Sequence, residues 1–180
     1  QNELCYITVG DTKLMAEVIK VNGKSAAVQV FESTRGLKNG NEVEFEDKML
    51  EATLGPGLLS SCYDGLQNDL TTMTGVFLQR GEYTDPLNHE KLWDFTPIAK
   101  PGDKVAAADW LGEVKEGWLP HKIMVPFSFK GEYTVKSVAE AGQYNIDQTI
   151  AVLTDASGED IEVNMYQKWP VKVAIKGYKE

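Results

Sequence analysis

Gly55-Pro56-Gly57-Leu58-Leu59, with Tyr63-Asp64-Gly65-Leu66-Gln67 shortly after it, marks the boundary between two β-rich regions. Gly-Pro-Gly predicts a sharp turn, because proline fixes φ and glycine adopts backbone conformations that other residues avoid. We therefore interpret residues 51–80 as a connector between two domains.

The second half of this connector predicts the one short helix of the chain. Asp64 is a suitable N-terminal cap, because its carboxylate accepts hydrogen bonds from N–H groups of the first turn. Leu66 and Leu70 would share one helical face at i, i+4 spacing. We expect the helix to run from Gly65 to about Met73 and to end at Gly75.

Residues 1–50 predict a small N-terminal β-barrel. Short runs of β-branched and aromatic residues alternate here with turn residues, as in strands joined by tight connections. Asn22-Gly23 is the strongest hairpin signal, since both residues tolerate positive φ. The expected strands cover residues 4–9, 13–21, 26–31 and 42–45, and a further strand over 48–54 leads out to the connector.

Residues 81–168 predict a second β domain, a barrel or a sandwich hybrid, so the fold class is mainly β. Turn sequences such as Lys100-Pro101-Gly102-Asp103 and Asp155-Ala156-Ser157-Gly158 separate the strand-like runs. The expected strands cover residues 93–95, two runs within 104–114 around Asp109, and residues 121–125, 131–137, 149–153 and 161–165.

Composition and charge argue against two classes of protein, those that bind nucleic acid and those that insert into a membrane. The net charge of −9 and the lack of a Lys/Arg cluster argue against nucleic-acid binding, which needs a basic face. No apolar run approaches the roughly 20 residues that span a bilayer, so we expect no membrane insertion. The only cysteines, Cys5 and Cys62, are too far apart for a disulfide scaffold and are expected to be reduced. No signal peptide opens the chain, and Gln1 is not an initiator methionine, so we expect that an end is missing. Together these features predict a cytosolic protein or fragment.

Gly23-Lys24-Ser25 resembles the tail of a phosphate-binding loop. The full loop needs a glycine five residues before Gly-Lys, so that backbone N–H groups wrap the phosphates, and it opens a helix. Val18 stands at that position and the following residues favour a strand. We therefore predict a hairpin here and no ATP site.

Other reactive side chains form no recognisable site. His89 and His121 are 32 positions apart and lack nearby ligands, so surface or packing roles are favoured over a metal. The residues around Ser60-Ser61-Cys62 do not resemble a nucleophile elbow, so we predict no catalytic nucleophile there. Carboxylate pairs such as Glu44/Glu46 and Glu159/Asp160 are expected to be solvated charges. The aromatic residues between Trp93 and Tyr133 are interpreted as core and protein contacts.

An alternative is a biotinyl- or lipoyl-type carrier domain. The run from Lys100 to Val105, then Asp109 to Val114, then Gly131 to Val135, looks like the barrel of that family. Such domains carry a modified lysine at a hairpin tip, and Lys122 is the nearest match. It lies too close to Val125-Pro126 for a hairpin tip to return to the sheet.

Five motifs together resemble a known family. Besides the two halves of the connector, they are Trp93-Asp94-Phe95-Thr96-Pro97, His121-Lys122-Ile123-Met124-Val125-Pro126 and Trp169-Pro170-Val171. In this order they are similar to the N-terminal barrel and bulge (the non-homologous insertion) of the catalytic A subunit, or alpha chain, of V-type and archaeal-type rotary ATPases. The resemblance implies that the N-terminal barrel is incomplete, because the family's first barrel strand would lie before Gln1. A second departure is Asn68-Asp69, where the family usually has Arg-Pro.

The resemblance implies a structural role. The barrel would form the crown of the subunit ring with B subunits, and the bulge would contact the peripheral stalk. Residues 169–180 would exit towards a nucleotide-binding domain beyond Glu180, where the phosphate loop, ATP, Mg and the catalytic residues belong. The segment itself would be non-catalytic and without cofactor, in the soluble cytoplasmic head of a proton- or sodium-translocating ATP synthase or ATPase. The interface candidates are Gly55, Pro56, Gly57, Tyr63, Asp64, Gly65 and Gln67.

Overall fold

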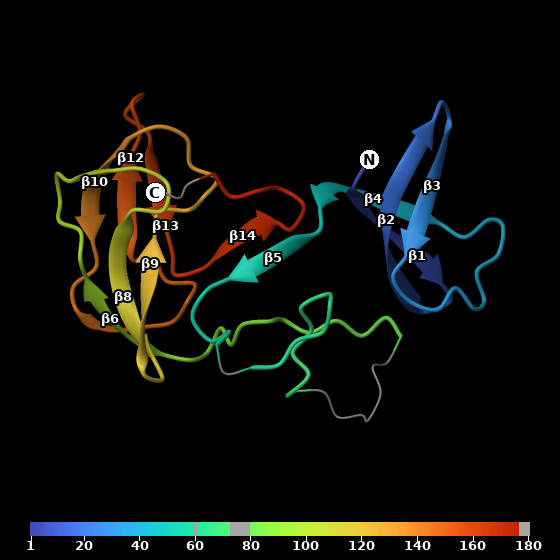
Figure 1. Ribbon diagram of the computed structural model, residues 1–180, viewed down its shortest axis with the longest axis horizontal. Helices are drawn as coiled ribbons and strands as arrows, with labels where there is room; N and C mark the ends of the chain where they lie inside the picture. Colours follow the sequence, from blue (N-terminus) through green and yellow to red (C-terminus); the bar gives the residue numbers. More distant parts are fainter. Residues whose placement is uncertain (60, 73–79, 177–180) are drawn as a thin grey trace.

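The computed structural model describes residues 1–59, 61–72 and 80–176, and within these ranges all regular secondary structure is β-strand (Figure 1). The mainly β fold class is therefore confirmed. No helix among the described residues has the length and hydropathy for crossing a membrane.

The first four strands form one antiparallel sheet in the order β3-β2-β1-β4. They are β1 (Glu3–Val9), β2 (Thr12–Asn22), β3 (Ser25–Val30) and β4 (Val43–Met49). The predicted Asn22-Gly23 hairpin is confirmed, because Asn22 pairs with Ser25 and Gly23 has a φ of 58°. The outer strands β3 and β4 do not pair with each other, so the described strands make an open sheet and not a closed barrel.

One face of this N-terminal sheet is apolar across its full width. Its buried members include Cys5 and Ile7 on β1. Directly opposite them on the edge strand β4 lie Phe45 and Val43, which are 50% and 41% exposed. The apolar face therefore continues from the buried centre of the sheet onto an exposed edge.

A two-stranded ribbon lies between the N-terminal sheet and the rest of the molecule (Figure 1). It pairs β5 (Glu51–Leu54) with β14 (Gln167–Pro170), residues more than a hundred positions apart in the sequence. The strand predicted over residues 48–54 is interrupted at Leu50, because β4 pairs with β1 while β5 turns to another partner. The strand β14 had no signal in the sequence, since it is short and ends in proline.

The remaining strands form two four-stranded antiparallel sheets, with orders β13-β12-β10-β7 and β11-β6-β8-β9. We call this part the barrel-sandwich domain. Its first sheet contains β7 (Lys104–Val105), β10 (Tyr133–Val138), β12 (Ala151–Thr154) and β13 (Asp160–Val163). Its second sheet contains β6 (Trp93–Pro97), β8 (Trp110–Glu116), β9 (Leu119–Met124) and β11 (Gly142–Tyr144).

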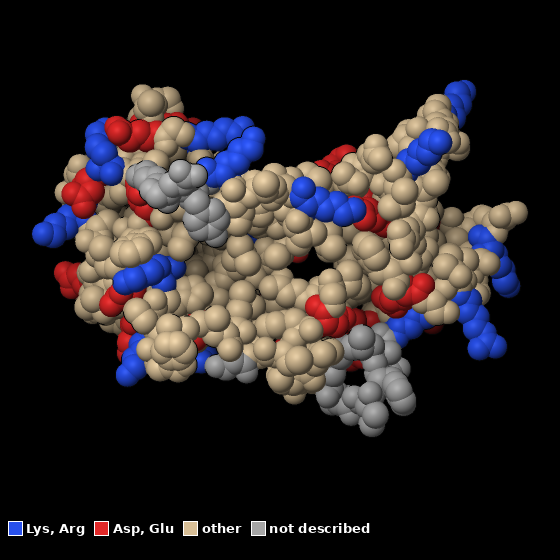
Figure 2. All heavy atoms as spheres, viewed as in Figure 1, with Lys and Arg blue, Asp and Glu red and all other residues tan. Residues whose placement is uncertain are grey.

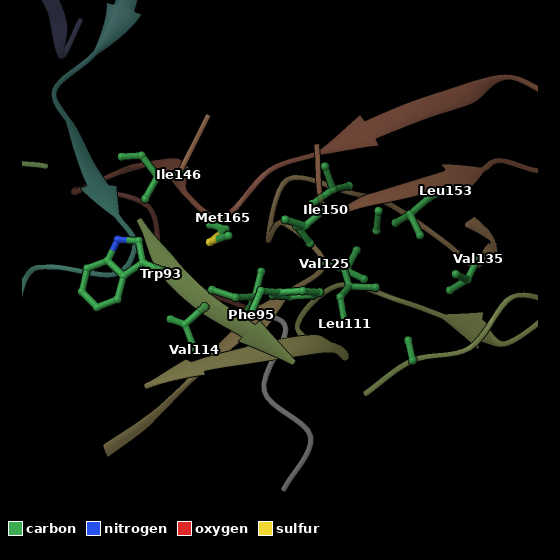
Figure 3. Close-up of a cluster of buried hydrophobic side chains, with 14 of the residues drawn as sticks. Trp93, Phe95, Leu111, Val114, Val125, Val135, Ile146, Ile150, Leu153 and Met165 are labelled. Carbon is green, nitrogen blue, oxygen red and sulfur yellow. The ribbon is translucent and has the colours of Figure 1, made fainter. Parts of the chain in front are cut away.

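Side chains from both of these sheets fill one core (Figure 3). Phe95 on β6 and Leu153 on β12 are 1% and 0% exposed. Gly112 on β8 lets the Phe95 ring approach the backbone, since an added Cβ would lie 2.3 Å from two ring carbons. The strand predicted over residues 93–95 and the second run predicted within 104–114 correspond to β6 and β8, which both contribute to this core.

The predicted connector helix is wrong. Residues 65–72 form turns and an isolated bridge between Tyr63 and Asp69, while Met73 and Gly75 lie outside the described residues. Gln67 has a φ of 64°, which a right-handed helix does not accommodate. The side chain of Asp64 binds the local backbone in a turn instead, a competition that is common for aspartate.

Candidate functional site

The Gly-Pro-Gly turn is held by one buried carboxylate. Oε1 of Glu116, at the end of β8, accepts hydrogen bonds from the N–H groups of Gly57 at 2.7 Å and Leu59 at 3.0 Å. Oε2 of the same side chain lies 2.6 Å from Nδ1 of His121 on β9. Glu116 is only 5% exposed. The first half of the connector is thus fastened to the β8–β9 hairpin.

Steric fit explains why glycine and proline occupy this turn. A Cβ added at Gly55 would lie 2.8 Å from Cβ of Tyr166 and 3.0 Å from Cδ1 of Leu87. Gly57 has a φ of 113°, in the region that favours glycine. Pro56 is fully buried beside them. Close packing against the barrel-sandwich domain therefore requires glycine at position 55, and the backbone conformation favours glycine at position 57.

The second half of the connector binds the ribbon through Gln67. Its Oε1 accepts the N–H of Thr53 at 2.7 Å and its Nε2 donates to the carbonyl of Thr53 at 2.7 Å. The amide thereby satisfies both main-chain groups of the central part of β5, as a neighbouring strand would. The hydroxyl of Tyr63 donates to the carbonyl oxygen of Pro86 at 2.8 Å.

Asp64 and Asn68 close the turn that replaces the predicted helix. Oδ1 of Asp64 accepts from the N–H groups of Leu66 at 2.9 Å and Asn68 at 2.8 Å, and its Oδ2 accepts from Nδ2 of Asn68 at 2.8 Å. Burial by itself would raise the pKa of Asp64, but these hydrogen bonds outweigh burial and lower the pKa below its ordinary value.

The departure from Arg-Pro in the family motif has a local explanation. Oδ1 of Asn68, which is 4% exposed, accepts the N–H of Thr84 at 2.9 Å. The N–H of Asp69 donates to Oγ1 of Thr84 at 2.7 Å, a bond that proline at this position could not make. The Asn68-Asp69 pair thus attaches the connector to the segment that follows it.

The structure brings Gly55, Gly57 and Tyr63 together against Pro86 and Leu87. Leu87 contacts the Gly55 position and Pro86 binds Tyr63, so this segment lies against both halves of the connector. Gly65 differs from the others, because an added Cβ there would meet no atom within 4 Å. The sequence did not predict that Glu116, His121, Asn68 and Thr84 hold the connector. Their partners are distant in the sequence or bind through main-chain groups.

The remaining candidate sites are placed as follows. Gly23 and Lys24 lie in the β2–β3 hairpin turn, as predicted. Lys122 lies within β9, ion-paired with Glu113 and 4.8 Å above the ring of Trp110, and the hairpin tip is formed by Gly117 and Trp118 instead. The carrier alternative therefore has no lysine at the tip of this hairpin.

The described residues contain no cluster of three or more His, Cys, Asp or Glu side chains suited to a metal ion. Ser60 lies outside the described residues, Cys5 is buried and Cys62 is exposed, and both thiols are free. The aromatic residues divide between roles: Trp93 and Phe95 are buried in the core, while Trp110 and Trp118 are 54% and 85% exposed.

Two family models match the chain. One is described as the β-barrel domain of the ATP synthase alpha/beta family and matches residues 1–47, and the other is the barrel-sandwich domain of ATP synthase alpha/beta subunits and matches residues 84–172.

Curated relatives match almost the whole chain. The V-type ATP synthase alpha chain of Treponema denticola is 48% identical over 182 residues, which cover 99% of this chain and 31% of the relative. The alpha chain of Chlamydia muridarum is 48% identical, covering 97% and 30%, and that of Borreliella burgdorferi (strain B31) is 46% identical, covering 99% and 32%. The chain spans about a third of the length of these relatives. These matches show that the chain belongs to the ATP synthase alpha/beta family, and its two β regions correspond to the barrel and barrel-sandwich domains of that family.

Proposed function

We propose that this chain is the structural, non-catalytic portion of the A subunit of a V-type rotary ATP synthase or ATPase, which couples ATP chemistry to proton or sodium transport. The observation that carries the proposal is the 46–48% identity to V-type ATP synthase alpha chains over 99% of the sequence. ATP and Mg would belong to the nucleotide-binding part of the parent subunit, and the chain itself would hold no cofactor.

The N-terminal sheet would pack beside B subunits in the crown of the ring. The apolar face that extends onto β4 supports this role, because Val43 and Phe45 leave a strip of apolar surface at a sheet edge. Exposed apolar strips of this kind typically mark protein contacts. In the assembled enzyme the crown would lie in the soluble head, on the cytoplasmic side and peripheral to the membrane.

The barrel-sandwich domain would contact the peripheral stalk through the β8–β9 hairpin. Trp118 at its tip is 85% exposed, and tryptophan is among the residues most enriched at energetically important contacts. Beside it lies a hollow of about 350 Å³ whose lining includes Asp94, Thr96 and Lys115. An exposed indole next to a shallow hollow is suited to anchoring a protein partner.

The net charge of −9 and the charges on the face shown in Figure 2 favour protein partners over nucleic acid. On the face shown in Figure 2, Lys and Arg side chains are scattered, and many alternate with Asp and Glu. A nucleic-acid groove would instead present a continuous basic stripe.

A binding experiment tests the proposal. The purified 180-residue chain is immobilised and titrated with the peripheral-stalk subunits of the same organism, measuring Kd. We expect the wild-type chain to bind and Trp118→Ala to weaken binding by about tenfold or more, as for a truncated contact tryptophan.

Trp110→Ala is the matched control, because Trp110 is also exposed but lies at the opposite end of β8. It should leave Kd within about twofold. Absence of stalk binding by the wild-type chain, or equal losses from both variants, would contradict the stalk contact.

A further inference from the structure

His89 lies between two carboxylates from different segments. Its Nδ1 is 2.8 and 2.9 Å from the two carboxylate oxygens of Asp147, in the loop between β11 and β12. Its Nε2 is 3.1 Å from Oδ2 of Asp85, in its own segment. The imidazole thus joins the segment after the connector to a loop of the barrel-sandwich domain.

Both ring nitrogens face acceptors, and this geometry selects the protonation state. A neutral imidazole carries one N–H and one lone pair, so it donates to only one carboxylate. The doubly protonated ring donates to both and adds a charge between two negative groups. Loss of one proton would leave a lone pair facing a carboxylate, which is repulsive.

Three further side chains lie near the imidazole of His89, whose ring nitrogens face Asp147 and Asp85. The ring of Tyr166 lies edge-on, with the centroids 5.8 Å apart. Lys168 on β14 and Tyr83 line the same hollow of about 430 Å³ as His89 and Asp85. The hydrogen bond with Asp147 raises the pKa of His89 above its usual 6.5, against the lowering effect of partial burial, and the charges of Asp85 and Asp147 raise it further.

We propose that His89 is a pH-sensitive clasp, which holds residues 85–89 against the loop of residues 145–148 while both ring nitrogens are protonated and loosens at alkaline pH. This device is independent of the proposed function. It acts on the connector, because Pro86 and Leu87 in the clasped segment contact Tyr63 and the Gly55 turn. Opening the clasp would therefore loosen the packing of both connector halves against Pro86 and Leu87.

The direction with pH follows from linkage. A histidine whose pKa is higher in the folded state stabilises the fold fully below its unfolded pKa, here about 6.5. That contribution is lost as the pH rises through the folded-state pKa. The clasp is therefore closed in mildly acidic solution and open in alkaline solution.

NMR titration of the imidazole groups tests the protonation claim. The chain has two histidines, so His89→Gln identifies the His89 resonances by their loss. We expect both ring N–H signals of His89 at pH 6 and a titration midpoint above 6.5. Asp147→Asn should lower that midpoint, and it tests the claim even if His89→Gln folds poorly. A midpoint at or below 6.5, or one that Asp147→Asn leaves unchanged, would overturn the proposal.

Hydrogen exchange tests the clasping. The amides of Leu87 and Glu90 are compared between wild type and His89→Gln at the same pH, so that the intrinsic pH dependence of exchange cancels. We expect roughly three- to tenfold slower exchange in wild type at pH 6 and a ratio near one at pH 9, since the clasp is a partly exposed pair.

Glu113→Gln is the control, because it removes an ion pair with Lys122 elsewhere in the barrel-sandwich domain, and it should leave exchange at Leu87 and Glu90 unchanged. A wild-type to His89→Gln ratio that stays the same from pH 6 to pH 9 would show that the side chain packs without acting as a switch.

Discussion

At the scale of single residues, Glu116 shows how a buried charge is made tolerable. Its carboxylate is 5% exposed, yet it accepts two main-chain N–H groups from the Gly-Pro-Gly turn and contacts His121. Buried carboxylates are stable only when hydrogen bonds and charges compensate for lost hydration. The turn and the β8–β9 hairpin are thereby made mutually dependent.

Glu116→Ala should therefore lower the free energy of unfolding substantially. Two main-chain N–H groups and the His121 ring would lose their buried partner, which we expect to cost about 2–4 kcal/mol. Glu113→Ala on the same strand is the control, because its partly exposed ion pair with Lys122 should contribute at most about 1 kcal/mol. Urea unfolding followed by tryptophan fluorescence measures both, and equal losses would contradict the special role of Glu116.

At the scale of elements, the connector is held by side-chain hydrogen bonds and not by helical ones. Asp64 and Gln67 each bind main-chain groups, one within its own turn and one on β5. Helix signals in residues 64–70 were real but weak, because a short helix gains little stability from its own hydrogen bonds. Tertiary contacts with β5 and Thr84 made the turn more favourable.

Asp64 should make the connector sensitive to acid. Its pKa is lowered in the folded state, so its contribution to stability is present above the ordinary value of 3.8 and is lost as the pH falls through the folded-state pKa. We expect Asp64→Asn to unfold at a lower urea concentration than wild type at pH 6, with the gap closing below about pH 3.8. A gap of constant size from pH 6 to pH 3 would contradict the role of the charge.

At the scale of the whole molecule, a few polar contacts join the N-terminal sheet to the other domain. The hydroxyl of Tyr83 donates to Glu32 at 2.6 Å and accepts the N–H of Met15 at 2.8 Å. Nζ of Lys172 donates to the buried Glu17 at 2.6 Å. Burial and the hydrogen bond to Glu32 raise the pKa of Tyr83, which keeps its hydroxyl protonated as this junction requires.

Tyr83→Phe should loosen this junction while leaving each domain folded. The substitution removes one hydroxyl and leaves the N–H of Met15 without its partner, at a cost of about 1–3 kcal/mol. We expect faster hydrogen exchange at Met15 and earlier urea unfolding of the N-terminal sheet. Tyr144→Phe is the control, because its hydroxyl binds Glu140 within the barrel-sandwich domain. Unchanged exchange at Met15 in Tyr83→Phe would contradict the junction.

Much of the architecture was readable from the sequence, because strand and turn signals are local. Asn22-Gly23 predicted its hairpin from backbone freedom alone, and strand-like runs between turn sequences predicted β6 and β8. The order of five motifs indicated the family that the relatives show. The domain boundaries and the interface role of the connector residues stay predictions.

The sequence by itself determined most of the strands, the Asn22-Gly23 hairpin and the family to which the chain belongs, since those properties depend on neighbouring residues and on motif order. Only the tertiary structure decided that β5 pairs with β14, that residues 64–70 form a turn, and that Glu116 and His89 fasten the connector. These features join residues far apart in the chain, and their free energy exists only once folding has brought the partners within hydrogen-bonding distance.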